Sequence, residues 1–105
     1  MSAHIYNVTV AVQPDIESEW VQWMRDEHIP DVLATGLFHS FVFTAVYPEQ
    51  EQDSPSFSIQ YRANDLESIQ LYMQVYAAEL RKKHKDAWGD RALAFRTILE
   101  VLDEQ

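Results

Sequence analysis

Residues 4–24 of the chain read HIYNVTVAVQPDIESEWVQWM, and this stretch decides the fold. Its first nine residues alternate between apolar and smaller or polar side chains, which predicts a half-buried strand whose apolar face carries Tyr6, Val8, Val10 and Val12. Apolar residues then recur at helical spacing, which predicts an amphipathic helix with a buried stripe of Ile16, Trp20, Trp23 and Met24. A strand followed by an amphipathic helix therefore opens the chain.

Pro30 interrupts this helical pattern. The proline ring clashes with the carbonyl group four residues earlier, at Asp26, and disfavours helical geometry at Ile29. We therefore expect the first helix to end near His28 and a short second helix to occupy residues 30–35.

The next part of the chain has the pattern of a hairpin. Residues 37–47 are rich in phenylalanine and valine, which predicts a strand. Residues 48–55 (PEQEQDSP) contain no apolar side chain except proline, and the alternation of residues 57–62 predicts a third strand. We therefore expect the second and third strands to pair across a solvated turn.

A second long helix and a last strand complete the pattern. Asn64 is the expected cap of this helix, whose buried stripe is predicted to hold Leu66, Ile69, Met73, Tyr76, Ala77 and Leu80. Gly89 ends the helix. Residues 92–102 are predicted to form the fourth strand, with Arg96 and Glu100 opposite the face that carries Leu93, Phe95, Leu99 and Val101.

The resulting order, β-α-β-β-α-β, is that of a ferredoxin-like α+β fold with a four-stranded antiparallel sheet and two helices on one face. A chain of 105 residues has the length of a single domain, so we expect residues 1–105 to form one. The uncovered sheet face should carry Ile5, Phe41 or Phe43, and Ile98. Such an apolar face is expected to associate with a second copy of the chain.

Composition narrows the classes of function. The chain has 17 acidic and 8 basic residues, a net charge of −9, which disfavours binding to nucleic acid and to anionic membranes. Its two glycines provide no dinucleotide fingerprint and its four histidines have no metal-ligand spacing, so we expect neither cofactor nor metal. Residues 1–7 lack the features of a secretory signal, and a cytoplasmic location is expected.

Two segments of the chain resemble a known family. Residues 5–38 (IYNVTVAVQPDIESEWVQWMRDEHIPDVLATGLF) and residues 92–102 (ALAFRTILEVL) resemble a family of small bacterial proteins known only as a domain of unknown function. That family is similar in turn to the dimeric α+β barrels, which include cofactor-free monooxygenases, isomerases and small-molecule sensors. The resemblance implies a homodimer formed sheet to sheet. It brings no set of catalytic residues with it.

His28 is the candidate catalytic residue. It lies beside the break expected at Pro30, where a histidine can act as an acid or base, or can instead satisfy the carbonyl groups at a helix end. Other candidates for the ligand pocket are Trp20, Trp23, Glu27 and Arg96. Glu27 continues the apolar stripe of the first helix, and a strand-borne arginine can clamp a carboxylate or an enolate. Each of these also has a purely structural interpretation, as a core residue, a solvated acid or an ion pair.

Two functions follow from these residues. The first is a homodimer that binds a small hydrophobic or aromatic metabolite. If it also transforms that metabolite, acid–base chemistry or cofactor-free oxidation through His28 is the expected class of reaction. The second is a sensor or protein-interaction module without catalysis. A roomy cavity that contains His28 with a perturbed pKa would favour the enzyme. A filled core with a large apolar outer helix face would favour the module.

Overall fold

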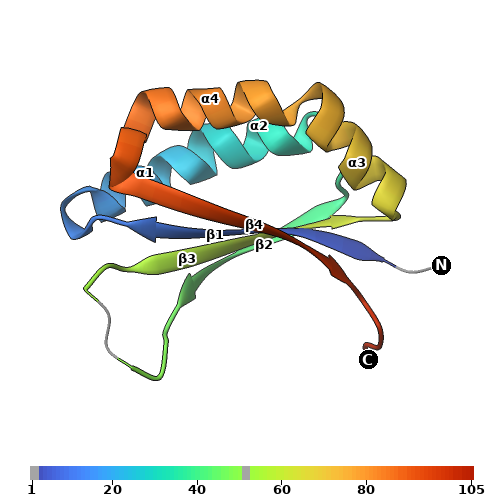
Figure 1. Ribbon diagram of the computed structural model, residues 1–105, viewed down its shortest axis with the longest axis horizontal. Helices are drawn as coiled ribbons and strands as arrows, with labels where there is room; N and C mark the ends of the chain where they lie inside the picture. Colours follow the sequence, from blue (N-terminus) through green and yellow to red (C-terminus); the bar gives the residue numbers. More distant parts are fainter. Residues whose placement is uncertain (1–2, 51–52) are drawn as a thin grey trace.

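In a computed structural model of the protein, which describes residues 3–50 and 53–105, the strands form one antiparallel sheet. Across these residues the strand order is β2-β3-β1-β4, so that β1 and β3 are central and β2 and β4 form the edges (Figure 1). The strands are β1 (His4–Val12), β2 (Ser40–Val46), β3 (Ser56–Ala63) and β4 (Ala92–Glu100). The predicted strands are all present, and those of residues 37–47 and 92–102 are shorter than expected.

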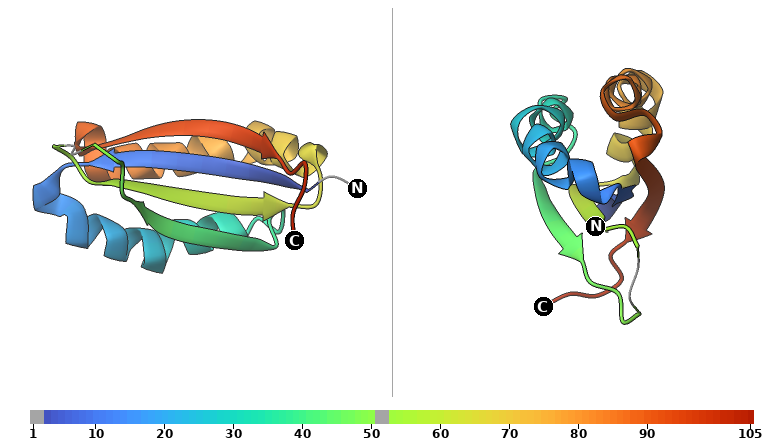
Figure 2. Two further views of the ribbon diagram at one scale, coloured as in Figure 1. Left: turned by 90° about the horizontal axis from the view of Figure 1, so that it is seen from below. Right: turned by 90° about the vertical axis from the view of Figure 1, so that its left-hand side faces the viewer.

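Two helical arms cover one face of this sheet and leave the other face bare (Figure 2). The first arm comprises η1 (Pro14–Ile16), α1 (Glu17–Trp23), the π-helical segment η2 (Met24–His28) and α2 (Ile29–Leu33). The second comprises α3 (Leu66–Val75), α4 (Ala77–Trp88) and η3 (Gly89–Arg91). The predicted ferredoxin-like α+β fold is therefore confirmed. No helix of the described residues is long and apolar enough to cross a membrane.

The alternation of β1 places its larger side chains toward the helices, as predicted. Tyr6, Val10 and Val12 are buried, and the strand register sets Tyr6 beside Tyr61 of β3 and Val10 beside Phe57. Trp20, which is completely buried, packs on this layer from α1. The core therefore lies between the sheet and the two helical arms, and any cavity between them is lined from both sides.

The prediction for the bare sheet face was partly wrong. Phe41 and Phe43 lie opposite Tyr61 and Ile59, and Ile98 lies opposite Tyr6, so all three face the helices. The bare face instead carries a polar centre, in which Asn7 is hydrogen-bonded with Ser58 and Thr97. Apolar side chains surround that centre, and those more than a third exposed are Val42, Val46, Leu93, Phe95 and Leu99.

The second helical arm also differs from its prediction. The helix turns at Tyr76, which separates α3 from α4, and Asp65 rather than Asn64 caps α3 by accepting a hydrogen bond from the Ser68 N–H at 2.8 Å. The predicted Leu66, Met73 and Tyr76 are more than a third exposed, because Ile69 and Tyr72 form the buried face of α3. The residues of this arm that are buried are Ile69, Tyr72, Ala77, Leu80, His84 and Trp88.

Candidate functional site

An aromatic and histidine cluster fills the seam between the two helical arms. The Trp20 indole N–H donates a buried hydrogen bond to Nε2 of His84, with a nitrogen–nitrogen distance of 3.0 Å. The His28 ring stacks on Trp23 at 5.4 Å and lies 5.8 Å from the His84 ring. Because Nε2 of His84 accepts the hydrogen bond from the Trp20 N–H, that imidazole is neutral and carries its own proton on Nδ1.

The π-helical segment η2 explains how His28 reaches this seam. The N–H of Ile29 donates to the carbonyl of Met24, five residues earlier instead of four. The wider turn accommodates the Pro30 ring, so Ile29 stays helical (φ −62°, ψ −45°) and the expected break is absent. His28 therefore lies within a continuous helical arm. The prediction that it stands at a helix end was wrong.

The extra residue in this turn also shifts which side chain faces inward. Strict helical spacing from Trp20 and Trp23 placed Glu27 at the centre of the apolar stripe. With the wider turn, His28 occupies the inward position and Glu27 is exposed. Wide turns of this kind are frequent at functional sites because they give one side chain a position that regular helix denies it.

Beneath His28, a small cavity of about 20 Å³ lies between the helical arms and the sheet. Its polar groups come from separate elements: Tyr6 on β1, Tyr61 on β3, Tyr72 on α3, Arg81 on α4 and Arg96 on β4. The side chains that line it include no carboxylate. A cavity with two guanidinium groups and no acid favours an anionic guest.

Several polar atoms at this cavity have incomplete hydrogen bonding. Arg81 donates from Nη2 to the Tyr6 hydroxyl at 2.9 Å, but its buried Nε has no partner among the described residues. The buried hydroxyl of Tyr61 also has none. Buried groups of this kind are costly unless a ligand or water completes their bonding. They are therefore available to a guest that carries both acceptor and donor atoms.

Burial and nearby positive charge keep both histidines neutral. Burial lowers the pKa of His28 to about 4, with further contributions from His84, Arg96 and Lys83. Burial and Arg96 likewise lower the pKa of His84 to about 4. Burial also raises the pKa of Tyr61 and of Tyr72 above the ordinary value for tyrosine. At neutral pH the site thus offers a neutral imidazole and neutral phenols beside two permanent cations.

The structure brings only some of the predicted pocket residues together. His28 and Arg96 line the same inner cavity. Trp23 and Glu27 instead lie with His28 along an open depression on the outer side of the seam, between η2 and α4. Trp20 has no exposed surface and lines neither space, so it acts on the site through its hydrogen bond to His84.

Sequence reasoning missed the remaining residues of the inner cavity. Tyr6 was predicted on the apolar face of β1, but the residues around it in the sequence gave no sign of its hydrogen-bond partner on α4. Arg81 lies in a basic run at residues 81–85, and positive charge near the C-terminal end of a helix is favourable without any ligand. Tyr72 follows Ile69 by three residues, so the alternative helical spacing from Ile69 could have identified it.

The strand order and the two helical arms define the ferredoxin-like class of α+β proteins, and comparison with known proteins agrees. The chain belongs to the family described as Domain of unknown function (DUF4286), which matches residues 3–102. A search of curated proteins finds no match to this sequence.

Solved structures of low sequence identity share the fold. A dimeric ferredoxin-like protein from an uncultured marine organism has a TM-score of 0.71 at 12% identity, covering 98% of this chain and 97% of its own. A protein of the ethyl tert-butyl ether d (ethd) family from Bacillus halodurans has a TM-score of 0.70 at 16% identity, covering 94% and 99%. SnoaB, a cofactor-independent oxygenase from Streptomyces nogalater, has a TM-score of 0.55 at 9% identity, covering 98% and 95%.

Proposed function

We propose that the protein binds a small hydrophobic or aromatic metabolite with an anionic group, and acts on it through His28 without a cofactor. The observation that carries this proposal is the inner cavity, where a neutral imidazole and two arginines converge and none of the described lining residues is an acid. Arg96 and Arg81 hold the anionic group, and the tyrosine rings contact its apolar part. The resemblance in fold to a protein described as a cofactor-independent oxygenase supports chemistry without a cofactor.

The proposed chemistry is proton abstraction. His28 is neutral at pH 7, because its pKa is about 4, and can accept a proton from an acidic C–H or O–H group of the bound ligand. The negative charge that develops on the ligand is then stabilised by Arg96 and Arg81. An anionic ligand beside Arg96 also weakens the effect of that arginine on His28, which raises the basicity of the imidazole once the ligand is bound.

The inner cavity of about 20 Å³ has room for about one water molecule, so a metabolite enters only when the helical arms separate. We expect the arms to separate along the seam between α4 and η2, because the solvent-exposed depression on the outer side of this seam already extends to His28. This closed state also favours the second candidate function, a sensor in which the ligand changes the packing of the arms without being transformed.

Phenylpyruvate tests binding at this site, since it carries an aromatic ring, a carboxylate and an acidic C–H. Replacing Arg96 with glutamine is expected to weaken its binding about tenfold or more, because one charge-assisted contact is lost. Isothermal titration calorimetry measures the affinity. Arg62→Gln is the matched control, because Arg62 lies on the bare face and pairs with Glu104 at 3.0 Å. Equal affinities for the two variants would contradict the proposed site.

Proton exchange separates the enzyme from the sensor. The protein is expected to accelerate deuterium incorporation at the benzylic carbon of phenylpyruvate in D₂O, and His28→Asn is expected to abolish the acceleration while binding remains. One-dimensional NMR follows the loss of the benzylic signal against a protein-free control. Binding without any acceleration by the unmodified protein would favour the sensor, and would overturn the catalytic role of His28.

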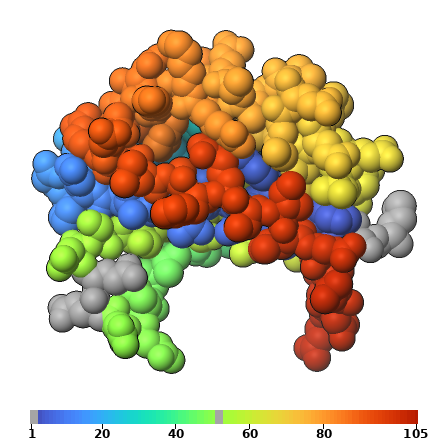
Figure 3. Space-filling model, viewed as in Figure 1, coloured from blue at the N-terminus to red at the C-terminus, as the bar shows by residue number. Residues whose placement is uncertain are grey.

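A homodimer formed through the bare sheet face is the second part of the proposal. Two segments project from this side of the molecule, around residues 45–50 and at the C-terminus, and the sheet surface lies open between them (Figure 3). Phe95 is 70% exposed near the middle of β4, and such an aromatic side chain stabilises an interface. Solved structures of the same fold that are described as dimeric support a homodimer.

Light scattering tests the dimer. The unmodified chain is expected to have twice its 12.3 kDa mass at micromolar concentration, and Phe95→Glu is expected to have the monomer mass. Leu71→Glu is the control, because Leu71 is 46% exposed on α3, away from the sheet. Dissociation by Leu71→Glu but not by Phe95→Glu would place the interface on the helices and contradict the proposal.

A further inference from the structure

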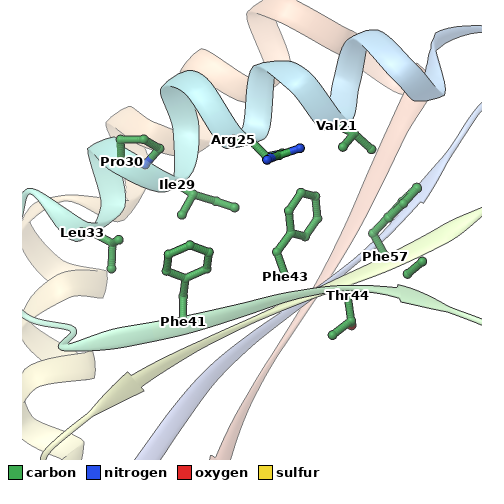
Figure 4. A pocket seen from close by; sticks show the side chains of 10 residues that line it. Val21, Arg25, Ile29, Pro30, Leu33, Phe41, Phe43, Thr44 and Phe57 are labelled. Atoms are coloured by element: carbon green, nitrogen blue, oxygen red, sulfur yellow. The ribbon is translucent and has the colours of Figure 1, made fainter.

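A separate apolar groove runs along the outer side of the first helical arm, where α1 and α2 pass over edge strand β2 (Figure 4). Its volume is about 650 Å³, within the range of small-molecule sites. Val21, Ile29 and Leu33 line it from the helices, and Phe41, Phe43 and Phe57 line it from the sheet. The groove shares no lining residue with the cavity or the depression at His28.

Arg25 is the one charged side chain among the described residues that line this groove. It lies on the helical arm between Val21 and Ile29, and in Figure 4 its guanidinium group stands across the groove from the ring of Phe43. No carboxylate among the described residues lies within ion-pair distance of Arg25. The neighbouring Asp26 instead accepts a hydrogen bond from Gln22 at 2.7 Å. On a chain with a net charge of −9, an unpaired cation beside an apolar surface selects a ligand that has both an anionic group and an apolar part.

The shape of the groove defines that ligand further. Val21, Arg25, Ile29 and Leu33 follow one another at four-residue intervals, so the apolar wall continues for two turns beyond the cation. The eight residue steps from Arg25 to Leu33 span roughly 12 Å at the rise of an α-helix. Across from this wall, Phe41 is 43% exposed, as expected of a surface that a ligand covers. An elongated apolar chain with a negative charge at one end matches this layout.

We propose that the groove is a second binding site, for a linear hydrophobic carboxylate such as a medium-chain fatty acid. The carboxylate accepts hydrogen bonds from the guanidinium group of Arg25. The chain lies against Ile29 and Leu33 on one side and Phe41 on the other, where burial of its methylene groups stabilises the complex. This site does not depend on the proposed function of His28, because none of its residues belongs to that cavity.

Decanoate and decanol, both below their aggregation concentrations, test the site by calorimetry. The affinity of decanoate for the unmodified protein is expected to be at least about tenfold higher than its affinity for Arg25→Gln. Decanol is expected to bind more weakly than decanoate, and with the same affinity to both proteins. Phe41→Ser, a change at a half-exposed position, is expected to weaken both ligands. Arg62→Gln and His28→Asn are expected to leave both affinities unchanged. Methyl NMR signals of Ile29 and Leu33 are expected to shift when decanoate is added.

Three results would overturn the proposal. Equal binding of decanoate by the unmodified protein and by Arg25→Gln would show that the guanidinium group plays no part. Loss of decanoate binding in His28→Asn, with Arg25→Gln unaffected, would place the ligand in the inner cavity and would leave the proposed function of that cavity standing. If light scattering showed that Phe41→Ser is a monomer and the unmodified protein a dimer, a second copy of the chain would cover the groove.

Discussion

Replacing Trp20 with alanine is expected to lower the free energy of unfolding by about 3–5 kcal/mol, the usual cost of removing a large aromatic side chain from a core. Trp20 has no exposed surface, and its ring contacts Phe43 and Phe57 at centroid distances of 5.9 and 5.1 Å. The substitution also leaves Nε2 of His84 without its donor. Urea denaturation followed by far-ultraviolet circular dichroism measures the loss, and it does not depend on tryptophan emission.

Two further variants separate packing from hydrogen bonding. Trp20→Phe keeps most of the apolar contact but removes the indole N–H, so it is expected to cost about 1–3 kcal/mol, the cost of one buried polar atom left unpaired. Trp23→Ala, at a partly buried position, is expected to cost less than Trp20→Ala. A smaller loss for Trp20→Ala than for Trp23→Ala would mean that Trp20 is not the centre of this core.

The order of the strands and helices followed from periodicity because each pattern depends on a single buried face. The alternation of β1 has one consistent inner face, and β3 repeats it, so both strands were identified with the correct orientation. At β2 the apolar residues are consecutive, and Phe41 and Val42 point to opposite faces. The pairing of Phe41 with Tyr61 determines that the Phe41 side chain, and not that of Val42, points toward the helices. The sequence around Phe41 does not reveal this pairing.

The helical arms show where local rules fail. The Pro30 ring excludes a regular α-helical turn before it, and the extra residue in the π-helical turn relieves that clash. This turn costs less free energy than a break in the helix, because a break would expose the buried Ile29 and Val32. In the second arm, Asn64 and Asp65 are both good caps in adjacent positions, so the sequence could not distinguish them. The packing of Tyr72 against Tyr6 and Phe38 determines which face of α3 is buried.

The candidate site was predictable only as separate pieces. His28 and Arg96 were both identified from local position, on a helix and on a strand. The proximity of His28 and Arg96 depends on two features. One is the extra residue in the turn of η2, which no periodic sequence pattern indicates. The other is the register of β4, which places Arg96 opposite Val8. Arg81 enters the cavity because the turn at Tyr76 redirects α4. These features come from tertiary packing, so sequence spacing alone could not have assembled the cavity.

Acidification from pH 7 to pH 5 is expected to lower the free energy of unfolding by about 2 kcal/mol through His84 alone. The pKa of His84 is about 4 in the folded protein and returns to the ordinary 6.5 when the chain unfolds. Between these values the unfolded chain binds the proton and the folded protein does not, so acid favours unfolding. The stability that His84 provides is therefore complete above pH 6.5 and is lost as the pH falls toward 4.

His28 acts in the same direction, since its pKa is also lowered to about 4. The two rings lie 5.8 Å apart, and Arg96 lowers the pKa of both, so their contributions are coupled and do not simply add. The test is urea denaturation at intervals between pH 7 and pH 5. This range stays above the ordinary pKa of carboxyl groups, whose protonation would relieve repulsion on a chain of net charge −9 and oppose the histidine effect.

His84→Gln is the decisive variant because the glutamine carbonyl can accept the Trp20 hydrogen bond but cannot take up a proton. It is expected to unfold with a much shallower dependence on pH, and the matched control His39→Gln, at an exposed position, is expected to keep the full dependence. If His84→Gln retained the whole slope, the burial of His84 against Trp20 would not be its source. A slope removed only when His28 is also replaced would instead show that the two histidines take up a single shared proton as the seam between the helical arms opens.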